Sequence, residues 1–490
     1  MRGAGLLALG YIGTQAVTIG VYAVLARLAP PSTFGAFAAA SIIVAAGTFL
    51  SESGMTAALV RRPGAIDAAA ATATVSTFAA GVFLSLLALA LSPLVGLFFR
   101  SGQIGDVAAA LSGLLFLNAV AVVPGALLQR RLSLRPRLFI EPFSALVVGV
   151  ASGVALAAGL GIWGLAVGAY ASAVFRAGSL WLFGGWLPRL GDASWAMWKE
   201  LTAFARHIVA SEGLRYTGTV ASTAVVGRTL GTTSLGVYGA GWRIAEAGAK
   251  LTSVGQYMLL PAFSRIAAEP LRFRQAFERA LRTSALVVFP VFAVFLSLGE
   301  PIAVLLFGDV WAEAGQVLMA LSFLAVTGAV GSVAAEAVKA AGRPDILPPA
   351  TALAAIVPIA LMFLLLPLGA VGVGLAFSIG YGISMSYVLV RGSRVVGVPF
   401  GTTLGLLRAP AVGAIGFAVV AFSLDRFLLH AADHSGLLGF VLLGIAMLAG
   451  GLAYVVIAML LSSEVAVELR TILRMLIPRI GASQDRGSLP

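Results

Sequence analysis

The sequence contains no cysteine and few charged residues. Of its 490 residues, 11% are charged and 60% are hydrophobic, and the mean hydropathy is +1.01. Without cysteine, the chain has neither disulfides nor thiolate metal sites. A soluble domain is usually about 45–50% apolar and about 25% charged. The excess of apolar surface therefore indicates a protein that faces lipid.

Several catalytic and cofactor motifs are also missing. We find no Walker motif, HExxH or GxSxG pattern, so ATP-driven pumping and common hydrolase chemistry lack support. His430, Asp433 and His434 have helical metal-ligand spacing, but they fall in a short turn between two apolar segments, where a solvated loop is the better interpretation. The glycines of 369–374 have no strand before them, so helix packing explains them better than dinucleotide binding. We expect no enzyme activity, no metal and no cofactor.

The apolar residues form blocks long enough to cross a hydrocarbon core about 30 Å thick. No short alternating strands of a barrel are visible, so helices are the expected way to satisfy the backbone in lipid. The predicted membrane spans are 5–27, 34–60, 70–98, 106–128, 138–160, 164–187, 204–228, 233–262, 284–307, 312–338, 347–367, 370–390, 408–428 and 436–461.

Most of the 32 Lys and Arg residues fall in the termini and in the loops after even-numbered spans. The positive-inside rule then places both termini in the cytoplasm. The formal charge of +12 is explained by this topology and by contact with anionic lipid, so we expect no nucleic-acid partner. Two amphipathic stretches, 193–206 and 269–282, are predicted to lie in the membrane interface.

The two halves of the sequence share short motifs. The segment 27–37 matches 228–238, where Arg, Gly and an aromatic residue recur at the same spacing, 201 positions apart. Three further pairs share an offset of 208: 93–99 with 301–307, 135–136 with 343–344, and 161–164 with 369–372. Four matches in the same order predict an internal repeat.

The repeat predicts the domain organisation. Residues 1–190 and 191–400 would each form a six-helix bundle, related by an axis along the membrane normal. Residues 401–465 would add two helices, and 466–490 would be a cytoplasmic tail. The predicted fold is thus an all-α integral membrane protein of about 14 transmembrane helices, with two pseudo-twofold-related bundles around a central cavity and two C-terminal helices.

Polar residues inside the predicted spans form stripes at helical spacing. The stripes are Tyr11, Gln15, Thr18 and Tyr22 in span 1; Thr48, Glu52 and Thr56 in span 2; Glu212, Arg215, Thr219 and Ser222 in span 7; and Arg243, Glu246, Lys250, Ser253 and Tyr257 in span 8. Ionisable residues at this depth usually face a cavity. The candidate substrate-binding residues are Arg215, Arg243, Lys250, Glu246, Glu212, Glu52 and Arg176.

Two interpretations of these charges stay open. Arg215, Arg243 and Lys250 could contact an anionic head group, because arginine donates bidentately to phosphate and keeps its charge. Alternatively, Glu246 could pair with Lys250 and with Arg243 as a structural brace. For Arg176, packing or a structural ion pair is an equal alternative, and Glu52 would either titrate with transport or pair with an arginine.

The segments 27–37 and 51–61 resemble the start of polysaccharide-biosynthesis flippases of the multidrug/oligosaccharidyl-lipid/polysaccharide exporter superfamily. The segment 225–238 resembles the signature of the second half in that family. The resemblance implies alternating access and a polyprenyl-pyrophosphate-linked glycan, moved from the cytoplasmic to the outer leaflet of a bacterial inner membrane. It also implies helices 1, 2, 7 and 8 around the cavity, with Arg215, Arg243 and Lys250 at the pyrophosphate. Where many relatives have an acidic residue, this chain has Ser222, so coupling to a proton or sodium gradient stays open.

Lipid II or multidrug export is the alternative within the superfamily, and a membrane glycan polymerase or ligase is the alternative of another class. An enzyme of that class usually has a large outer loop, which the predicted topology lacks. The expected partners are the lipid-linked glycan and membrane lipids, with the polysaccharide assembly machinery added by analogy.

Overall fold

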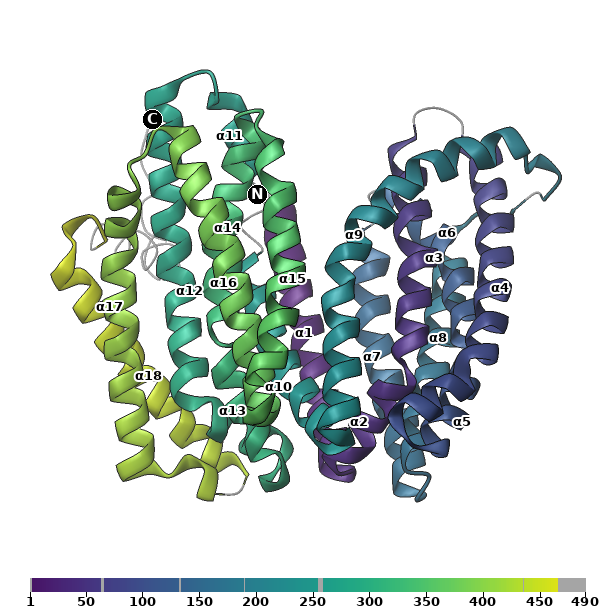
Figure 1. Cartoon of the computed structure of the whole chain (residues 1–490), viewed down its shortest axis with the longest axis horizontal. Coiled ribbons are helices and arrows are strands. Elements are labelled where there is room, and N and C mark those ends of the chain that lie inside the picture. Colours follow the sequence, from purple (N-terminus) through teal and green to yellow (C-terminus); the bar gives the residue numbers. More distant parts are fainter. Residues whose placement is uncertain are drawn as a thin grey trace, which may run out of the picture. The chain divides into compact units, whose positions relative to one another are not determined.

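The computed structural model describes residues 2–62, 66–131, 134–188, 190–253, 259–434 and 436–465. Within these ranges, the side chains of 2–12, 49–53, 134–135, 137, 190, 207–217, 219 and 251–253 are not described. The described chain is built of helices and contains no strand (Figure 1). It is therefore all-α, as predicted.

The helices of the first part of the chain are α1 Arg2–Leu28, α2 Pro31–Ala40, α3 Ile42–Arg61, α4 Asp67–Phe99, α5 Gly102–Leu111, α6 Leu114–Arg130, α7 Leu134–Ala157 and α8 Ile162–Gly184. The remaining helices are α9 Trp195–Thr229, α10 Gly231–Ser253, α11 Leu259–Ile266, α12 Pro270–Phe307, α13 Ala312–Leu321, α14 Phe323–Ala340, α15 Leu347–Leu365, α16 Gly369–Val396, α17 Phe400–Leu424 and α18 Leu437–Leu461. The predicted spans overlap these helices where the chain is described, but 34–60, 106–128 and 312–338 are each divided between two helices, and α9 and α12 begin well before the predicted spans 204–228 and 284–307.

Nine helical segments of the described chain are long and apolar enough to cross a membrane. The count becomes ten if α2 and the first part of α3, which are bent by 49° at Ser41, form one span. One of the nine, Pro344–Val396, contains both α15 and α16. The predicted total of fourteen remains a prediction. The amphipathic segments 193–206 and 269–282 form the beginnings of the long helices α9 and α12 rather than separate helices.

Two kinds of helix break, one at a serine and one at a glycine, occur in both halves of the chain. Between α5 and α6, Ser112 Oγ donates to the Ala109 carbonyl at 2.7 Å; between α13 and α14, Ser322 Oγ donates to the Met319 carbonyl, also at 2.7 Å. A serine hydroxyl that competes for backbone carbonyls in this way often bends a helix. Positive-φ glycines lie at the starts of α8 and α16: Gly161 has φ +52° and Gly369 has φ +64°.

By internal contacts the chain forms two compact units. Unit 1 comprises Met1–Val254, Gly299–Leu324 and Leu347–Ser384, and unit 2 comprises Gly255–Leu298, Ala325–Ile346 and Met385–Pro490. These units are not the predicted repeat halves, and the division at 190 and 400 remains a prediction.

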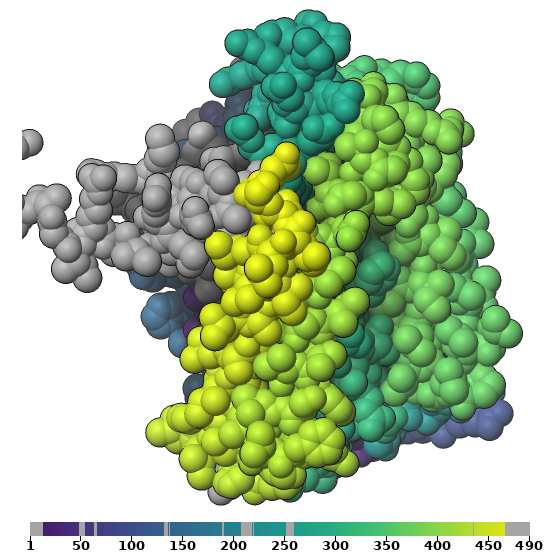
Figure 2. Space-filling view, turned by 90° about the vertical axis from the view of Figure 1, so that its left-hand side faces the viewer, coloured from purple at the N-terminus to yellow at the C-terminus, as the bar shows by residue number. Residues whose placement is uncertain are grey.

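In unit 2, α17 and α18 lie side by side, and Figure 2 shows α18 in yellow along α17 in yellow-green. Tyr454 of α18 donates its hydroxyl to the Leu286 carbonyl of α12 at 3.0 Å. A Cβ at Gly413 of α17 would come within 2.9 Å of the Tyr454 ring. Close contact therefore holds the pair together, while aliphatic residues such as Ile415 and Leu452 stay exposed, as expected of a surface in contact with lipid.

In unit 1, the repeat motifs contact each other reciprocally. Arg27 Nη2 donates to the Leu305 carbonyl at 2.6 Å and its Nε donates to Leu306 at 3.3 Å, at the end of α12. Arg228 Nη1 donates to the Phe98 carbonyl at 2.7 Å, at the end of α4. These carbonyls belong to the last turns of their helices, where no intrahelical partner remains. Arg27, in a repeat motif of the first half, therefore caps the end of α12 in the second half. Its counterpart Arg228, in the second half, caps the end of α4 in the first half.

We expect Arg27→Ala to lower the free energy of unfolding by about 1–2 kcal/mol, because the side chain donates two charge-assisted hydrogen bonds to the C-terminal carbonyls of α12. Thermal unfolding of the purified protein in detergent measures this. The control is Arg272→Ala, which removes an exposed arginine paired with Glu269 at 2.9 Å and should change stability by less than about 0.5 kcal/mol. Equal effects of the two substitutions would contradict the capping role.

Candidate functional site

A small polar cavity lies between α1 and α10 within unit 1. It has a volume of about 200 Å³. Its polar lining residues are Gln15, Thr18, Tyr22, Arg243, Glu246 and Lys250. Gln15, Thr18 and Tyr22 recur at i, i+3 and i+7 on α1, and the three charged residues recur in the same way on α10. Helical spacing puts each set on one face, and the packing of the two helices brings the faces together.

The two cations of this cavity have different partners. Lys250 Nζ lies 2.9 Å from Glu246 Oε1, so the predicted pair within one helix is present. The Arg243 guanidinium carbon lies 4.6 Å from the centre of the Tyr22 ring, a cation–π contact. Two cations and one carboxylate leave the lining with one net positive charge.

An aromatic cluster forms one wall of the cavity. Tyr22 meets Phe34 and Phe307 edge to face, with ring centres 5.0 and 5.3 Å apart. Trp311, which is fully buried, packs on the same rings and donates its indole N–H to the Ala26 carbonyl at 3.0 Å. Rings that interlock in this way are held in one orientation. Arg243 therefore stacks on a ring that is itself fixed.

Arg176 lines a different cavity from Arg243, Glu246 and Lys250. The second cavity lies among α3, α6, α7, α8 and α9 and has a volume of about 560 Å³. Arg176 Nε lies 4.0 Å from Glu141 Oε1 there. Of the span 2 stripe, Thr56 lines this cavity, and Thr48 Oγ1 accepts a hydrogen bond from Asn118 of α6 at 3.2 Å. The two described members of that stripe thus face α6 or the larger cavity, not the cavity between α1 and α10.

The side chains of Glu52, Glu212 and Arg215 lie outside the described residues. Ser222 is buried, with 2% of its surface exposed. Of the described residues, no three His, Cys, Asp or Glu side chains could hold a metal ion together.

Sequence reasoning missed three residues of the larger cavity: Arg61, Gln129 and Glu141. Arg61 lies just outside the predicted span 34–60, although it is the last residue of α3. Glu141 carried a usable signal, because an acidic residue inside an apolar span usually faces a polar environment. No spacing rule would have found Gln129.

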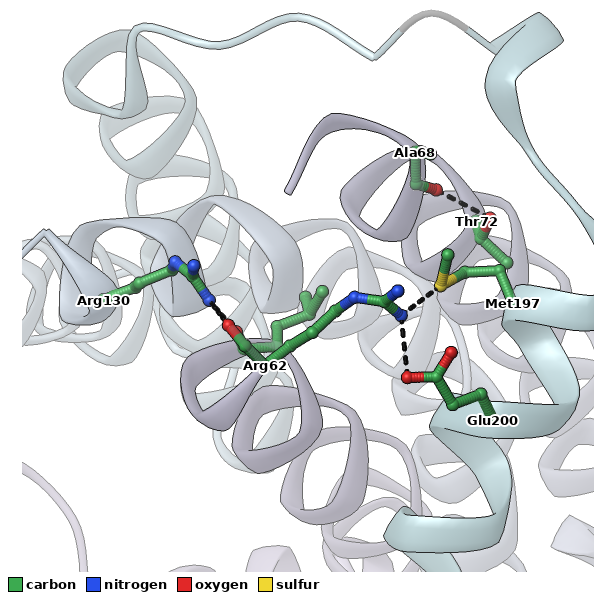
Figure 3. A network of polar contacts seen from close by, with 7 residues as sticks. Arg62, Ala68, Thr72, Arg130, Met197 and Glu200 are labelled. Atoms are coloured by element: carbon green, nitrogen blue, oxygen red, sulfur yellow. Dashed lines mark hydrogen bonds and ion pairs between the residues drawn. The ribbon is translucent and has the colours of Figure 1, made fainter. Parts of the chain in front are cut away.

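A polar network ties the end of α3 to α6 and α9. Arg62 Nη1 lies 3.0 Å from Glu200 Oε1 and also contacts the Met197 sulfur (Figure 3). Arg130 of α6 donates to the Leu59 carbonyl at 3.1 Å and to the Arg62 carbonyl. Arg130 therefore caps the C-terminus of α3, while Arg62 holds the first turns of α9 against it.

We expect Arg130→Ala to lower the free energy of unfolding by about 2 kcal/mol, because two carbonyls at the end of α3 lose a charged donor. Arg130→Lys keeps the charge but cannot donate as a planar fork, so it should recover part of the loss. Thermal unfolding with both variants checks this. If Arg130→Ala unfolds at the wild-type temperature, the cap does not contribute to stability.

Many apolar helices together with a polar, cationic cavity are features of membrane transporters. Residues 24–316, more than half of the chain, match the polysaccharide biosynthesis protein family. The chain belongs to this family, which confirms the resemblance found in the sequence.

Two curated relatives are named as proteins of polysaccharide biosynthesis. The succinoglycan biosynthesis transport protein ExoT of Rhizobium meliloti (strain 1021) is 26% identical over 327 residues, which cover 65% of this chain and 64% of ExoT. The lipopolysaccharide biosynthesis protein WzxC of Escherichia coli (strain K12) is 25% identical over 334 residues, or 66% of each chain. The match thus spans just under two thirds of the length of both relatives.

Solved structures share the fold. The lipid II flippase MurJ, in an inward closed conformation, superposes with a TM-score of 0.74 at 14% identity, over 96% of this chain and 100% of MurJ. A multidrug resistance MATE family transporter in an inward-facing conformation superposes with a TM-score of 0.63 at 16% identity, over 79% of this chain and 94% of that one. At such identities the likeness concerns the fold alone.

Proposed function

We propose that this protein is a flippase that moves a polyprenyl-pyrophosphate-linked glycan, a polysaccharide precursor, from the cytoplasmic to the outer leaflet of a bacterial inner membrane by alternating access. The observation that carries the proposal is the cavity in which Arg243 and Lys250 meet the polar face of α1. The family and the name of ExoT, a succinoglycan biosynthesis transport protein, support the class of cargo.

The cavity suits the charged part of such a cargo. Its volume of about 200 Å³ is below the 300–1,000 Å³ of ordinary ligand pockets, so it fits a small polar group better than a sugar chain. Arg243 offers a planar donor to phosphate oxygens, and Lys250 adds a second charge. Gln15 and Thr18 supply neutral partners on the opposite helix. In this assignment the pyrophosphate binds between α1 and α10, and the glycan and the lipid tail extend away from it.

In many transporters, alternating access is the rocking of one structural repeat against the other. The reciprocal bonds of Arg27 and Arg228, and the matching glycine and serine positions, support two bundles of related structure. With these bundles, six spans in each and two more at the C-terminus, the chain would have fourteen spans and both ends in the cytoplasm. The pathway's assembly machinery would receive the glycan at the outer leaflet.

A leaflet-protection assay in proteoliposomes tests the proposal. The purified protein is reconstituted with a polyprenyl-pyrophosphate glycan, with lipid II or with a cationic dye, and access of an impermeant reagent to each cargo is followed. We expect the protein to accelerate the exposure of the glycan only. Acceleration of lipid II or of the dye alone would replace the proposal by the corresponding export function, and acceleration of none would refute flipping by this chain alone.

A further inference from the structure

An apolar groove lies between α4 and the beginning of α9, within unit 1 (Figure 1). Its volume of about 570 Å³ is in the range of pockets for small organic molecules. One wall is a single face of α4, because the lining residues there run from Thr72 to Phe83 at helical spacing. The other wall is formed by Ala193, Ser194, Trp195 and Trp198.

The groove belongs to a surface that faces lipid. Helix α4 is long and apolar enough to cross a membrane, and only 22% of its most apolar part is buried. Val75 and Phe83, which line the groove, are 43% and 64% exposed. Exposed apolar residues in the middle of a spanning helix contact acyl chains. The molecules that surround the groove are therefore membrane lipids.

The polar atoms of the groove are gathered at one end. The Ser194 N–H donates to Thr72 Oγ1 at 3.1 Å, and the Trp198 indole N–H donates to Ser76 Oγ at 3.2 Å. Beyond Ser76, the α4 wall is apolar as far as Phe83. Tryptophan favours the membrane interface, where its ring is in an apolar medium and its N–H is bonded. The polar end of the groove therefore lies at the interface, and the apolar end points into the bilayer.

The length of the groove matches one leaflet. From Thr72 to Phe83, α4 rises about 16 Å, at about 1.5 Å per residue. The hydrocarbon core is about 30 Å thick, so the acyl chains of one leaflet extend about 15 Å. Phe83 is the middle residue of α4, which runs from Asp67 to Phe99. The groove thus has the length and the direction for one acyl chain that runs from the interface to the bilayer centre.

Basic side chains lie beside the polar end. Lys199 Nζ is 5.8 Å from the centre of the Trp195 ring, a cation–π contact. Lys199 and Arg206 are both exposed and are seven residues apart, so they lie on the same face of α9. Basic residues at a membrane surface attract anionic head groups. The charge at this end of the groove therefore complements a lipid phosphate.

The acidic residues nearby do not cancel this charge. Glu200 Oε1 lies 3.0 Å from Arg62 Nη1, so these two charges offset each other. Asp192, which precedes α9, leaves one net positive charge from Lys199 and Arg206. A zwitterionic lipid would fill the groove equally well but would gain less from this charge.

We propose that the groove binds one anionic phospholipid of the membrane, with an acyl chain along α4 and the phosphate beside Lys199. The rings of Trp195 and Trp198 are stacked with their centres 4.3 Å apart, and they cover the part of the chain nearest the head group. The site is separate from the Arg243 cavity, and the proposal does not depend on the cargo assigned to that cavity.

Quenching of tryptophan fluorescence by brominated lipid tests the proposal. The full-length protein is reconstituted in phosphatidylcholine vesicles that contain a rising fraction of phosphatidylglycerol or phosphatidylcholine with dibrominated acyl chains. The signal is the part of the quenching that is lost in Trp195→Phe, because bromine quenches only indoles close to it. We expect phosphatidylglycerol to occupy the groove at least about fivefold more readily, which corresponds to about 1 kcal/mol and to the contribution of one basic residue. Equal quenching of Trp195 by the two lipids, or by neither, would overturn the proposal.

Variants locate the lipid. Lys199→Gln should reduce the preference for phosphatidylglycerol to less than about twofold, whereas Lys199→Arg should keep it. Ala79→Phe should reduce the preference as well, because it fills the groove without changing a charge. Its matched control is Ala90→Phe: both alanines are exposed, and Ala90 lies about three turns further along the same face of α4, outside the groove. Thermal unfolding checks that each variant is folded. If folded Lys199→Gln or folded Ala79→Phe keeps the preference of the wild type, the lipid does not occupy this groove.

Discussion

Gly236→Ala is expected to lower the free energy of unfolding by about 3 kcal/mol, at the upper end of what overpacking usually costs. A Cβ at Gly236 would lie 1.9 Å from the Pro31 carbonyl oxygen, and a Cβ at Gly35 would lie 1.7 Å from the Thr232 carbonyl oxygen. The obstacles are backbone atoms, which cannot rotate away as a flexible side chain can. The two glycines, 201 positions apart in the repeat motifs, thus allow α2 and α10 to touch. Thermal unfolding of the purified variant measures the loss.

Gly239→Ala is the matched control. Gly239 lies three residues further along α10, and a Cβ there would have nothing within 4 Å. Alanine is favoured over glycine within a helix by about 0.5–1 kcal/mol, so this variant should be as stable as the wild type or slightly more stable. If both variants have the same stability, the close approach of α2 and α10 is not required for the fold.

The sequence predicted those features that depend on one helix at a time. Hydropathy located the helices, because a helix that faces lipid must be apolar over its whole length. Periodicity grouped Gln15 with Tyr22 and Arg243 with Lys250, because the position of a residue on a helix follows from its number alone. Both groups line one cavity of the structure.

Features that depend on the rotation and packing of whole helices were not predictable in the same way. Arg176 was grouped with Arg243, but the orientation of α8 places it beside Glu141 in the larger cavity. The spacing of residues within α8 does not reveal which neighbour its polar face meets. The same limit applies to the reciprocal caps: the motifs around Arg27 and Arg228 were recognised as equivalent, but their carbonyl partners follow from the packing.

Arg243→Ala is expected to slow translocation of a polyprenyl-pyrophosphate glycan by about 10- to 100-fold. Hydrogen bonds from a charged donor contribute about 1.5–3 kcal/mol, and each 1.4 kcal/mol is a factor of ten. Lys250→Ala should have a smaller effect, because Glu246 at 2.9 Å already offsets that charge. Leaflet protection in proteoliposomes with equal amounts of folded protein measures both rates. The control is Arg391→Ala, which removes another arginine stacked on a tyrosine, 5.6 Å from Tyr387, outside the cavity.

A double substitution separates the charge of the cavity from the shape of its arginine. Arg243→Ala leaves Lys250 and Glu246, whose charges cancel, whereas adding Glu246→Gln restores one net positive charge without restoring the guanidinium. If the cavity binds an anion, the double variant should translocate faster than Arg243→Ala and slower than the wild type, because a point charge attracts phosphate but does not hold it bidentately. If Arg243 is instead a brace between α10 and the Tyr22 ring, removing Glu246 cannot help, and the double variant will be no faster than the single one. The order of these two rates therefore decides whether Arg243 binds an anion or acts as a brace between α10 and the Tyr22 ring.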